Sequence, residues 1–371
     1  MISHRVSSSE VTTAIALAGP LILAFNLGDC SHDSTNEDAG IKFEPLAESS
    51  GMIRCNAAFA AQNHRSEQGV RLDNPATAEE AVVAAGLDWD VQLQPIYTGP
   101  ERATRVKDRY VVCRTDRLDH EDSGQLGVVG RNFTALQNRD AFGFLDPVVG
   151  NGAAIYHTAG SLRGGRRVWL LAKLPGHIRV VGDDVAEKFI LLSNGHDGTA
   201  AVRIGLTPIR VVCMNTLNLA LRGMGGLSIR HNPDVAQRVQ SAHKLLGLVN
   251  STLDAAEVTM QRMAGIQMTG NRLTDYFQEL APLPANDEAE RNRVLDRRRR
   301  WSELFESGDG NRMPGVRGTL WAAYNAVTQW TDRESYTRRN KEPLNTIWFG
   351  EGELLKRRAF LLGERTITRC N

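Results

Sequence analysis

The stretch that most constrains this chain runs from Tyr156 to Leu174 and reads YHTAGSLRGGRRVWLLAKL. Two strand-compatible runs flank Gly164-Gly165, and a Gly-Gly pair supplies the positive φ angles that a tight two-residue hairpin turn requires. We therefore predict a β-hairpin with this pair as its loop. Counting outward from the loop gives the register: Arg163 faces Arg166, Leu162 faces Arg167, Gly160 faces Trp169, Thr158 faces Leu171 and Tyr156 faces Lys173.

Because side chains alternate along a strand, this register predicts two faces of different chemistry. One face interleaves cations with aromatic and aliphatic groups: Arg167, Trp169, Leu171, Lys173 and Tyr156. The other is apolar and suits a core: Val168, Leu170, Ala172, Leu174, Ala159 and Ile155. Cations between aromatics are typical of surfaces that follow a single-stranded nucleic acid and stack its bases. The alternative is a solvated hairpin whose indole covers Gly160, since exposed basic residues commonly serve solubility alone.

The charge distribution favours a polyanionic partner only mildly. The net charge is +1, but residues 1–123 hold 11 Lys and Arg against 19 Asp and Glu, whereas residues 124–230 hold 12 against 6. Residues 231–371 hold 21 against 18. An acidic beginning followed by a basic middle section is compatible with a nucleic-acid partner for that middle section.

The cysteines and the N-terminal stretch bear on where the chain works. The five cysteines form no CxxC pair, which argues against a zinc ribbon and a disulfide framework and favours a reducing, cytoplasmic setting without a cofactor. The apolar run 11–27 resembles a signal-peptide core but is too short for a membrane span, so we expect no membrane partner. We expect residues 1–50 to be an extension that is disordered or outside the fold.

The remaining pattern predicts an α+β protein, with a mainly antiparallel sheet core over residues 51–230 and a helical C-terminal region over residues 231–371 packed on it. In the first region we expect a helix over 76–87, a helix that begins at Asn132, and strands over 89–96, 110–114, 126–129, 178–181, 188–192, 199–204 and 209–214. A short helix capped by Asn215 should follow. In the second region we expect a long amphipathic helix over 234–268 and helices over 273–280, 288–306, 319–332 and 352–362.

Several long strings of this sequence resemble the phage/plasmid-like protein family, which is the domain of unknown function 932 family. The strings are ATAEEAVVAAGLDWDV (76–91), LGVVGRNFTALQNRDAFGFLD (126–146), AGSLRGGRRVWLLAKLP (159–175), LLSNGHDGTAAVRI (191–204), IRVVCMNTLNLAL (209–221) and GTLWAAYNAVTQWTDR (318–333). The resemblance implies a protein of phages, plasmids or other mobile elements and assigns no activity to the motif residues. Such elements often encode single-strand annealing proteins, but that link is an analogy.

The loop SNGHDG over residues 193–198 is the best candidate for an enzymatic site. His196 and Asp197 could act as acid and base, and Asp183 and Asp184 could add carboxylates for a metal ion, which would make a metal-dependent hydrolase or nuclease. The alternative is a turn that uses Asn, Gly and Asp for their backbone tolerance.

The leading hypothesis from sequence is a binder of single-stranded DNA that acts in recombination or replication of a mobile element. In it, Arg163, Arg166, Arg167, Lys173 and Arg203 contact phosphates while Trp169 and Tyr156 stack bases. A third hypothesis is an assembly protein whose helix over 234–268 offers a surface for homo-oligomers. The first hypothesis requires that Arg167, Trp169 and Lys173 point outward together over a solvated surface.

Overall fold

The computed structural model of the chain describes residues 69–72, 77–102, 104–118, 124–150, 152, 154–213, 215–216, 227–241, 247–335 and 342–370. The expectations about residues 1–50 and about the helix after Asn215 lie outside them. All described residues belong to one compact unit. Antiparallel sheets followed by a helical C-terminal region confirm the α+β prediction.

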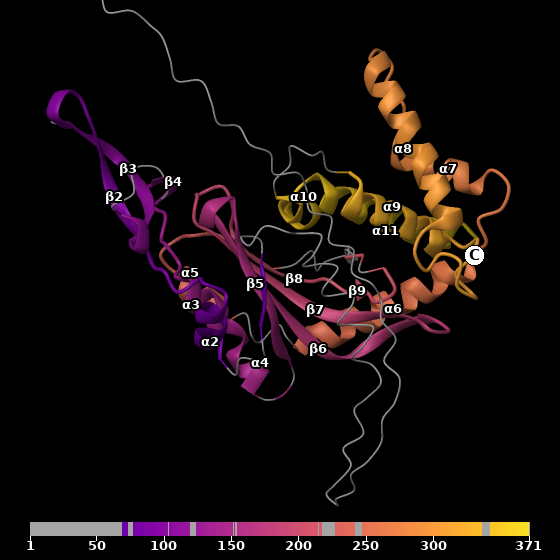
Figure 1. Ribbon diagram of the computed structural model, residues 1–371, viewed down its shortest axis with the longest axis horizontal. Helices are drawn as coiled ribbons and strands as arrows, with labels where there is room; N and C mark the ends of the chain where they lie inside the picture. The colour runs from indigo at the N-terminus through magenta and orange to yellow at the C-terminus, as the bar shows by residue number, and fades with distance from the viewer. Residues whose placement is uncertain are drawn as a thin grey trace, which may run out of the picture. The chain divides into compact units, whose positions relative to one another are not determined.

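The larger sheet, sheet A, is built around the predicted hairpin (Figure 1). Its strand order is β1-β5-β6-β7-β8-β10, every pairing is antiparallel, and β9 pairs with β7. The longest strand, β6, runs through Pro175-Gly176, with an irregularity between Lys173 and His177. The strand expected over 209–214 is limited to β9. The bounds are β1 Val70–Arg71, β5 Ile155–Leu162, β6 Arg167–Val181, β7 Asp184–Gly195, β8 Val202–Leu206, β9 Ile209–Arg210 and β10 Leu227–Ile229.

The smaller sheet, sheet B, is a three-stranded antiparallel meander of β2 (Val91–Thr98), β3 (Thr104–Arg114) and β4 (Gln125–Gly130). Strand β3 begins six residues before the predicted strand at Tyr110. Strand β2 continues past Pro95 with a register shift before Tyr97. Pro95 is tolerated because β2 is an edge strand and needs no donor there.

The helices between the sheets are short. In α2 (Ala78–Ala84) the Thr77 side chain accepts a hydrogen bond from the Glu80 amide, as expected for the cap of this helix. The helix expected from Asn132 begins later, as α3 (Asn138–Phe142), and is followed by α4 (Asp146–Gly150). The preceding residues are held by neighbouring elements instead: the Thr134 amide donates to the His231 carbonyl, and the side-chain amide of Gln137 pairs with both backbone groups of Val91 at the start of β2.

The C-terminal region is helical, as predicted, with one helix that the sequence analysis missed, α10. The expected long helix over 234–268 contains α5 and α6, and residues 242–246 between them lie outside the described part. The bounds are α5 Val235–Ser241, α6 Gly247–Gly265, α7 Arg272–Leu280, α8 Glu288–Ser307, α9 Leu320–Arg333, α10 Pro343–Phe349 and α11 Glu351–Cys370. Among the described residues, no helix combines the length and apolarity that a membrane crossing requires.

One hydrophobic core joins sheet A to these helices. Leu253, Ala256 and Met260 of α6 are fully buried in it, together with Val235 and Val239 of α5. The apolar stripe of the expected long helix is therefore occupied within the monomer, and the prediction that it offers a self-association surface is wrong for its described part. The core includes residues from both sides of residue 230, so the division into two regions stays a prediction from sequence.

Two buried ionic clusters fasten the helices to the sheet. Asp184 accepts two hydrogen bonds from Arg210, Nε–Oδ1 at 2.7 Å and Nη2–Oδ2 at 2.8 Å, and a third from Trp321 Nε1 of α9 at 2.7 Å. Lys356 of α11 donates to Asp332 at 2.7 Å and also to Thr216. Buried charges of this kind require such partners because their desolvation is unfavourable.

Candidate nucleic-acid interface

The hairpin tip has the predicted conformation. Gly164 and Gly165 have φ angles of 68° and 97°, and the Arg166 amide donates to the Arg163 carbonyl across the turn. The pairs Leu162–Arg167, Gly160–Trp169 and Thr158–Leu171 confirm the register over the half of the hairpin next to the tip. Arg163 itself has a φ of 55°, which is uncommon outside glycine.

A bulge between Tyr156 and Thr158 changes the rest of the hairpin. Ile155 pairs with Lys173, and Tyr156 pairs with Ala172, one position away from the predicted partner. Since side-chain direction alternates, a shift of one residue exchanges the faces. Tyr156 is therefore in the main core, where its hydroxyl donates to Asp146 at 2.7 Å, and Ile155 is exposed. Burial raises the pKa of Tyr156 far above its ordinary value, and the prediction that this ring stacks a base is wrong.

Trp169 is also buried, although it lies on the predicted face. Helix α10 covers this face of β6, and the Trp169 and Trp348 rings meet edge to face with centroids 4.8 Å apart. They belong to a second hydrophobic cluster that includes Leu171 and Phe189 of the sheet and Ile347 of α10. The Trp169 side chain is 0% exposed. The prediction that it stacks bases on a solvated surface is wrong, because the sequence analysis missed the helix that covers it.

Two of the predicted phosphate contacts are occupied within the protein. Lys173 forms an ion pair with Glu187 at 2.8 Å, and both side chains are largely buried. Arg167 donates to Asn345 of α10 at 3.0 Å, and its guanidinium lies over the Phe349 ring, 4.5 Å from the centroid. Arg167, Trp169 and Lys173 therefore do not point together toward solvent, and the geometry that the first hypothesis required is contradicted.

The arginines around the hairpin tip nevertheless form a cluster, because Arg163 and Arg166 meet across the turn and Arg167 and Arg203 flank the same end of β7. We call it the arginine cluster: Arg163, Arg166, Arg167 and Arg203. Arg163 forms an ion pair with Asp197 at 3.1 Å. Arg166 and Arg203 are exposed and form no ion pair with the described residues. The pKa of Arg167 is lowered by burial and by the neighbouring charges of Arg203 and Arg163, and Asp197 only partly opposes this. Three guanidinium groups thus lie close together with one nearby carboxylate between them.

The loop that contains His196 and Asp197 is structural. Asn138 donates from Nδ2 to the carbonyls of Leu87 and Trp89, so its Oδ1 must accept from His196 Nε2, at 2.9 Å. This leaves Nδ1 of His196 unprotonated and buried, with no partner among the described residues. The imidazole is fully buried, and burial lowers its pKa to about 3. Asp197 accepts from the amide and hydroxyl of Thr199, as a turn requires.

The four residues proposed for a metal-dependent hydrolase do not meet. Asp184 begins β7 and is held by Arg210, Asp183 is exposed in the adjacent turn, and His196 and Asp197 follow the other end of β7. Because β7 has 12 residues, its ends lie about 35 Å apart at the usual rise per residue. No group of three or more potential metal-ligating side chains occurs in the described ranges. The prediction that His196, Asp197, Asp183 and Asp184 form one site is wrong.

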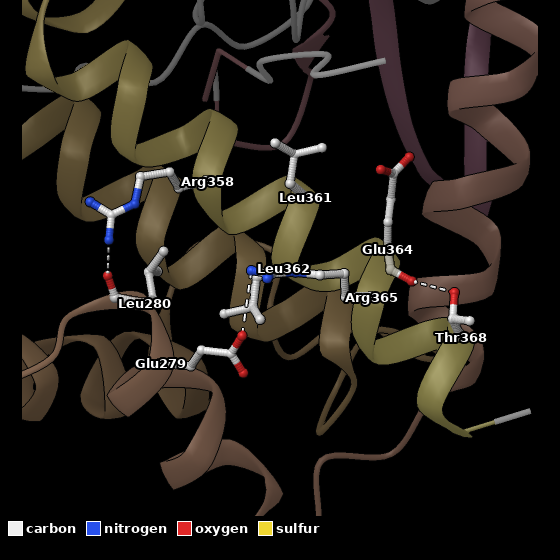
Figure 2. Close-up of a pocket in the computed structure, with 8 residues that line it drawn as sticks. All are labelled: Glu279, Leu280, Arg358, Leu361, Leu362, Glu364, Arg365 and Thr368. Carbon is white, nitrogen blue, oxygen red and sulfur yellow. Dashed lines mark hydrogen bonds and ion pairs between the residues drawn. The ribbon is translucent and has the colours of Figure 1, made fainter. Parts of the chain in front are cut away.

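A separate cleft of about 740 Å³ lies between α7 and α11 (Figure 2). Its polar groups already bind one another: Arg358 donates to the Leu280 carbonyl at 2.7 Å, and Arg365 forms an ion pair with Glu279 at 3.4 Å. Thr368 donates to the Glu364 carbonyl. The cleft therefore offers no converging set of unsatisfied groups for a ligand.

Two features that matter for the interface were missed from sequence. Helix α10 has a signal, since Pro343 at its first position precedes Leu344, Ile347 and Trp348 at helical spacing. The cations of the turn after β2 and of the first part of β3, namely Arg102, Arg105, Lys107 and Arg109, lie in a stretch that the strand prediction left out. Its exposed β-branched and polar residues gave no apolar alternation to detect.

Comparison with known proteins yields one match. Residues 125–348, more than half of the chain, match the family described as domain of unknown function (DUF932). No curated protein matches the chain, and no solved structure does. The matched range contains the hairpin, the arginine cluster and helix α10, which covers the hairpin.

Proposed function

Since the chain belongs to the domain of unknown function DUF932 family, whose description assigns no activity, we propose from the site itself that this protein binds nucleic acid through the arginine cluster. The exposed side chains of Arg166 and Arg203 contact phosphates directly, and Arg163 and Arg167 add to the local positive potential. The resemblance to proteins of mobile elements makes recombination or replication the expected setting.

One observation carries the proposal: Arg163 and Arg166 meet across the hairpin turn, and Arg167 and Arg203 flank the same end of β7, opposite Gly195 and Ser193, with Asp197 as the nearby carboxylate. Like charges held together are unfavourable unless solvent or an anion compensates them. Arginine suits phosphate because its planar guanidinium donates two parallel hydrogen bonds. The arginines of the cluster lie on the tip turn, on β6 and on β8. Because they are spread over these elements, they can contact successive phosphates of one nucleic-acid chain.

The burial of Trp169 and Tyr156 changes what kind of binding is expected. Without exposed rings to stack bases, the arginine cluster has only contacts to the backbone, which provide affinity without base recognition. The structural reason for preferring single strands is therefore removed. We expect the cluster to bind single strands and duplexes with affinities in the range of nonspecific binding, a Kd of about 10⁻⁴ to 10⁻⁶ M.

The test is fluorescence anisotropy with a labelled oligonucleotide, single-stranded and then annealed, at about 50 and about 200 mM salt. The variant is Arg166→Glu with Arg203→Glu. The matched control, Arg291→Glu with Arg357→Glu, changes the net charge equally on α8 and α11, which contribute nothing to the cluster.

We expect the cluster variant to bind at least tenfold more weakly and the control to bind within threefold of the natural protein. The slope of log affinity against log salt should fall by about 1.4 for the single strand, since two phosphate contacts are lost. Absence of binding by the natural protein at low salt, or equal losses in the two variants, would overturn the proposal.

A further inference from the structure

The outer part of sheet B is a two-stranded ribbon with little support from the core. We define the ribbon as residues 93–111, that is most of β2, the turn Pro100–Arg102 and the first part of β3, of which only Arg109–Val111 at the base also pair with β4. It extends away from sheet A (Figure 1). None of its described residues is buried. A two-stranded ribbon is at best marginally stable by packing, so these residues contribute little to the stability of the fold.

The ribbon carries an unneutralised positive charge. Arg102, Arg105, Lys107 and Arg109 are all exposed, and none forms an ion pair within the described part of the chain. The only acidic residues of the ribbon are Glu101 and Asp108. Two exposed arginines on α8, Arg293 and Arg299, are different, because each has a carboxylate partner three residues away.

The backbone of the ribbon is also unusual. Four described residues other than glycine have positive φ angles, and three of them are Glu101, Arg102 and Asp108 of the ribbon. The fourth is Arg163 of the arginine cluster. Such conformations cost about 1 kcal/mol or more and concentrate at functional sites. The ribbon and the arginine cluster therefore both contain residues other than glycine with a positive φ angle.

The ribbon begins beside the arginine cluster. At the base of sheet B, a Cβ on Gly127 would lie 2.6 Å from the backbone oxygen of Asp197, which shows how closely β4 packs on the loop after β7. A Cβ on Gly165 of the hairpin tip would lie 3.2 Å from Arg114 of β3. The two surfaces therefore lie at the same end of sheet A, and one extended polyanion can reach both.

We propose that the ribbon binds duplex DNA by lying in its major groove. That groove is about 12 Å wide and admits a two-stranded β-ribbon, whereas the major groove of duplex RNA is too narrow and a single strand has no groove. The excess of cations without an ion-pair partner fits an interface with DNA, which is much more polar and positively charged than an interface between two proteins. Tyr97 is exposed on the ribbon, and Arg105 donates to the Tyr110 hydroxyl at 3.3 Å.

This inference rests on the proposed function for its class of ligand but uses a different surface. The ribbon variant is Arg102→Ala, Lys107→Ala and Arg109→Ala, which leaves the contact between Arg105 and Tyr110 intact. Its control is Arg291→Ala, Arg293→Ala and Arg357→Ala, with the same change in net charge. Each is titrated against a duplex DNA of about 30 base pairs, one of its strands alone, and the duplex RNA of the same sequence. That length spans three turns at 10 to 10.5 base pairs per turn.

We expect the ribbon variant to lose at least tenfold in affinity for duplex DNA, with a salt slope smaller by about 2.7, and less than threefold for the single strand and the RNA. The natural protein should also protect guanine N7, an atom of the major groove, from methylation, and the ribbon variant should not. Equal losses on all three ligands, an unchanged duplex affinity, or an equal loss in the control would overturn the inference. If the cluster variant alone loses binding, the ribbon proposal fails and the proposed function stands. If the natural protein binds no nucleic acid, both fail.

Discussion

The indole of Trp169 meets the indole of Trp348 edge to face, 4.8 Å between ring centroids, where α10 covers the middle of β6. Trp348 is 5% exposed and Trp169 is 0% exposed. The contact decides which side of the hairpin solvent can reach. As a result, the face of β6 on which cations alternate with aromatic residues is buried against α10 in the second hydrophobic cluster.

Replacing Trp348 with alanine should remove most of this cover. We expect a loss of about 3 to 5 kcal/mol in the free energy of unfolding, because a buried tryptophan side chain is deleted and a cavity remains. Urea denaturation monitored by circular dichroism measures it. Leu354→Ala on α11 is the control, since that side chain is 54% exposed and should change stability by about 0.5 kcal/mol or less. Equal effects of the two substitutions would mean that α10 does not pack as described.

The buried pair of Asp184 and Arg210 can be compared with the neighbouring Asp183. In Asp184→Asn the Arg210 guanidinium stays buried without its counter-ion, so we expect a loss of about 3 to 5 kcal/mol. Asp183→Asn, one residue away and exposed, should cost about 0.5 kcal/mol or less. Thermal unfolding of the two variants under one buffer condition distinguishes them. A similar Tm for both would contradict the central role of the pair.

The packing of sheet B on the loop after β7 depends on Gly127. Gly127→Ala places a methyl group 2.6 Å from a backbone oxygen, which cannot move away as a flexible side chain could, so we expect a loss of about 1 to 3 kcal/mol. Gly205→Ala on β8 is the matched control, because nothing lies within 4 Å of its Cβ position. That control should be neutral or stabilise by about 0.4 to 1 kcal/mol through the unfolded chain. The opposite ranking in chemical denaturation would show that sheet B is not docked there.

Acidification should destabilise the fold through buried histidines. Burial lowers the pKa of His196 to about 3 and that of His157 to about 4, from an ordinary value near 6.5. Between these values the unfolded chain binds more protons than the folded one, so stability falls as the pH falls below about 6.5. Each such histidine contributes a slope of about 1.4 kcal/mol per pH unit inside its window.

Urea denaturation at about pH 7 and about pH 5 measures this slope. His196→Gln removes one titrating group, so its stability should depend less steeply on pH even if its stability at neutral pH is lower. The control is His177→Gln, which makes the same substitution at an exposed histidine on β6. An unchanged slope in the His196 variant would show that this imidazole is accessible to protons in the folded protein.

The hairpin tip could be predicted because its two glycines favour a turn by themselves. Which of its side chains are exposed could not be predicted, because this depends on elements that are distant in the sequence. Gly164 and Gly165 favour a tight turn whatever packs around them. The pairing of the strand residues next to the turn follows from counting outward from it. The bulge before Thr158 has no signal in the sequence, because a bulge is an extra residue that only the partner strand reveals. Which face is solvated depended on α10, about 180 residues further along the chain.

The helices of the second half were predicted well for a related reason. In α9, the cap at Thr319 and the apolar residues Leu320, Trp321 and Tyr324 all indicate one helix, and the structure contains it. The predicted site of His196, Asp197, Asp183 and Asp184 does not form. Residues that are close in the sequence lie far apart when an extended strand separates them. Asp184 and His196 are 12 positions apart, but a β-strand places them at opposite ends.

The ionic bond between Lys356 and Asp332 has a practical meaning for anyone who wishes to produce this protein in pieces. A recombinant segment trimmed to the family limits, residues 125–348, would keep the buried carboxylate but omit the ammonium group opposite it, and would also separate β4 from β2 and β3. Such a product should aggregate on expression. A segment that keeps both features must begin before β2 and extend beyond Lys356.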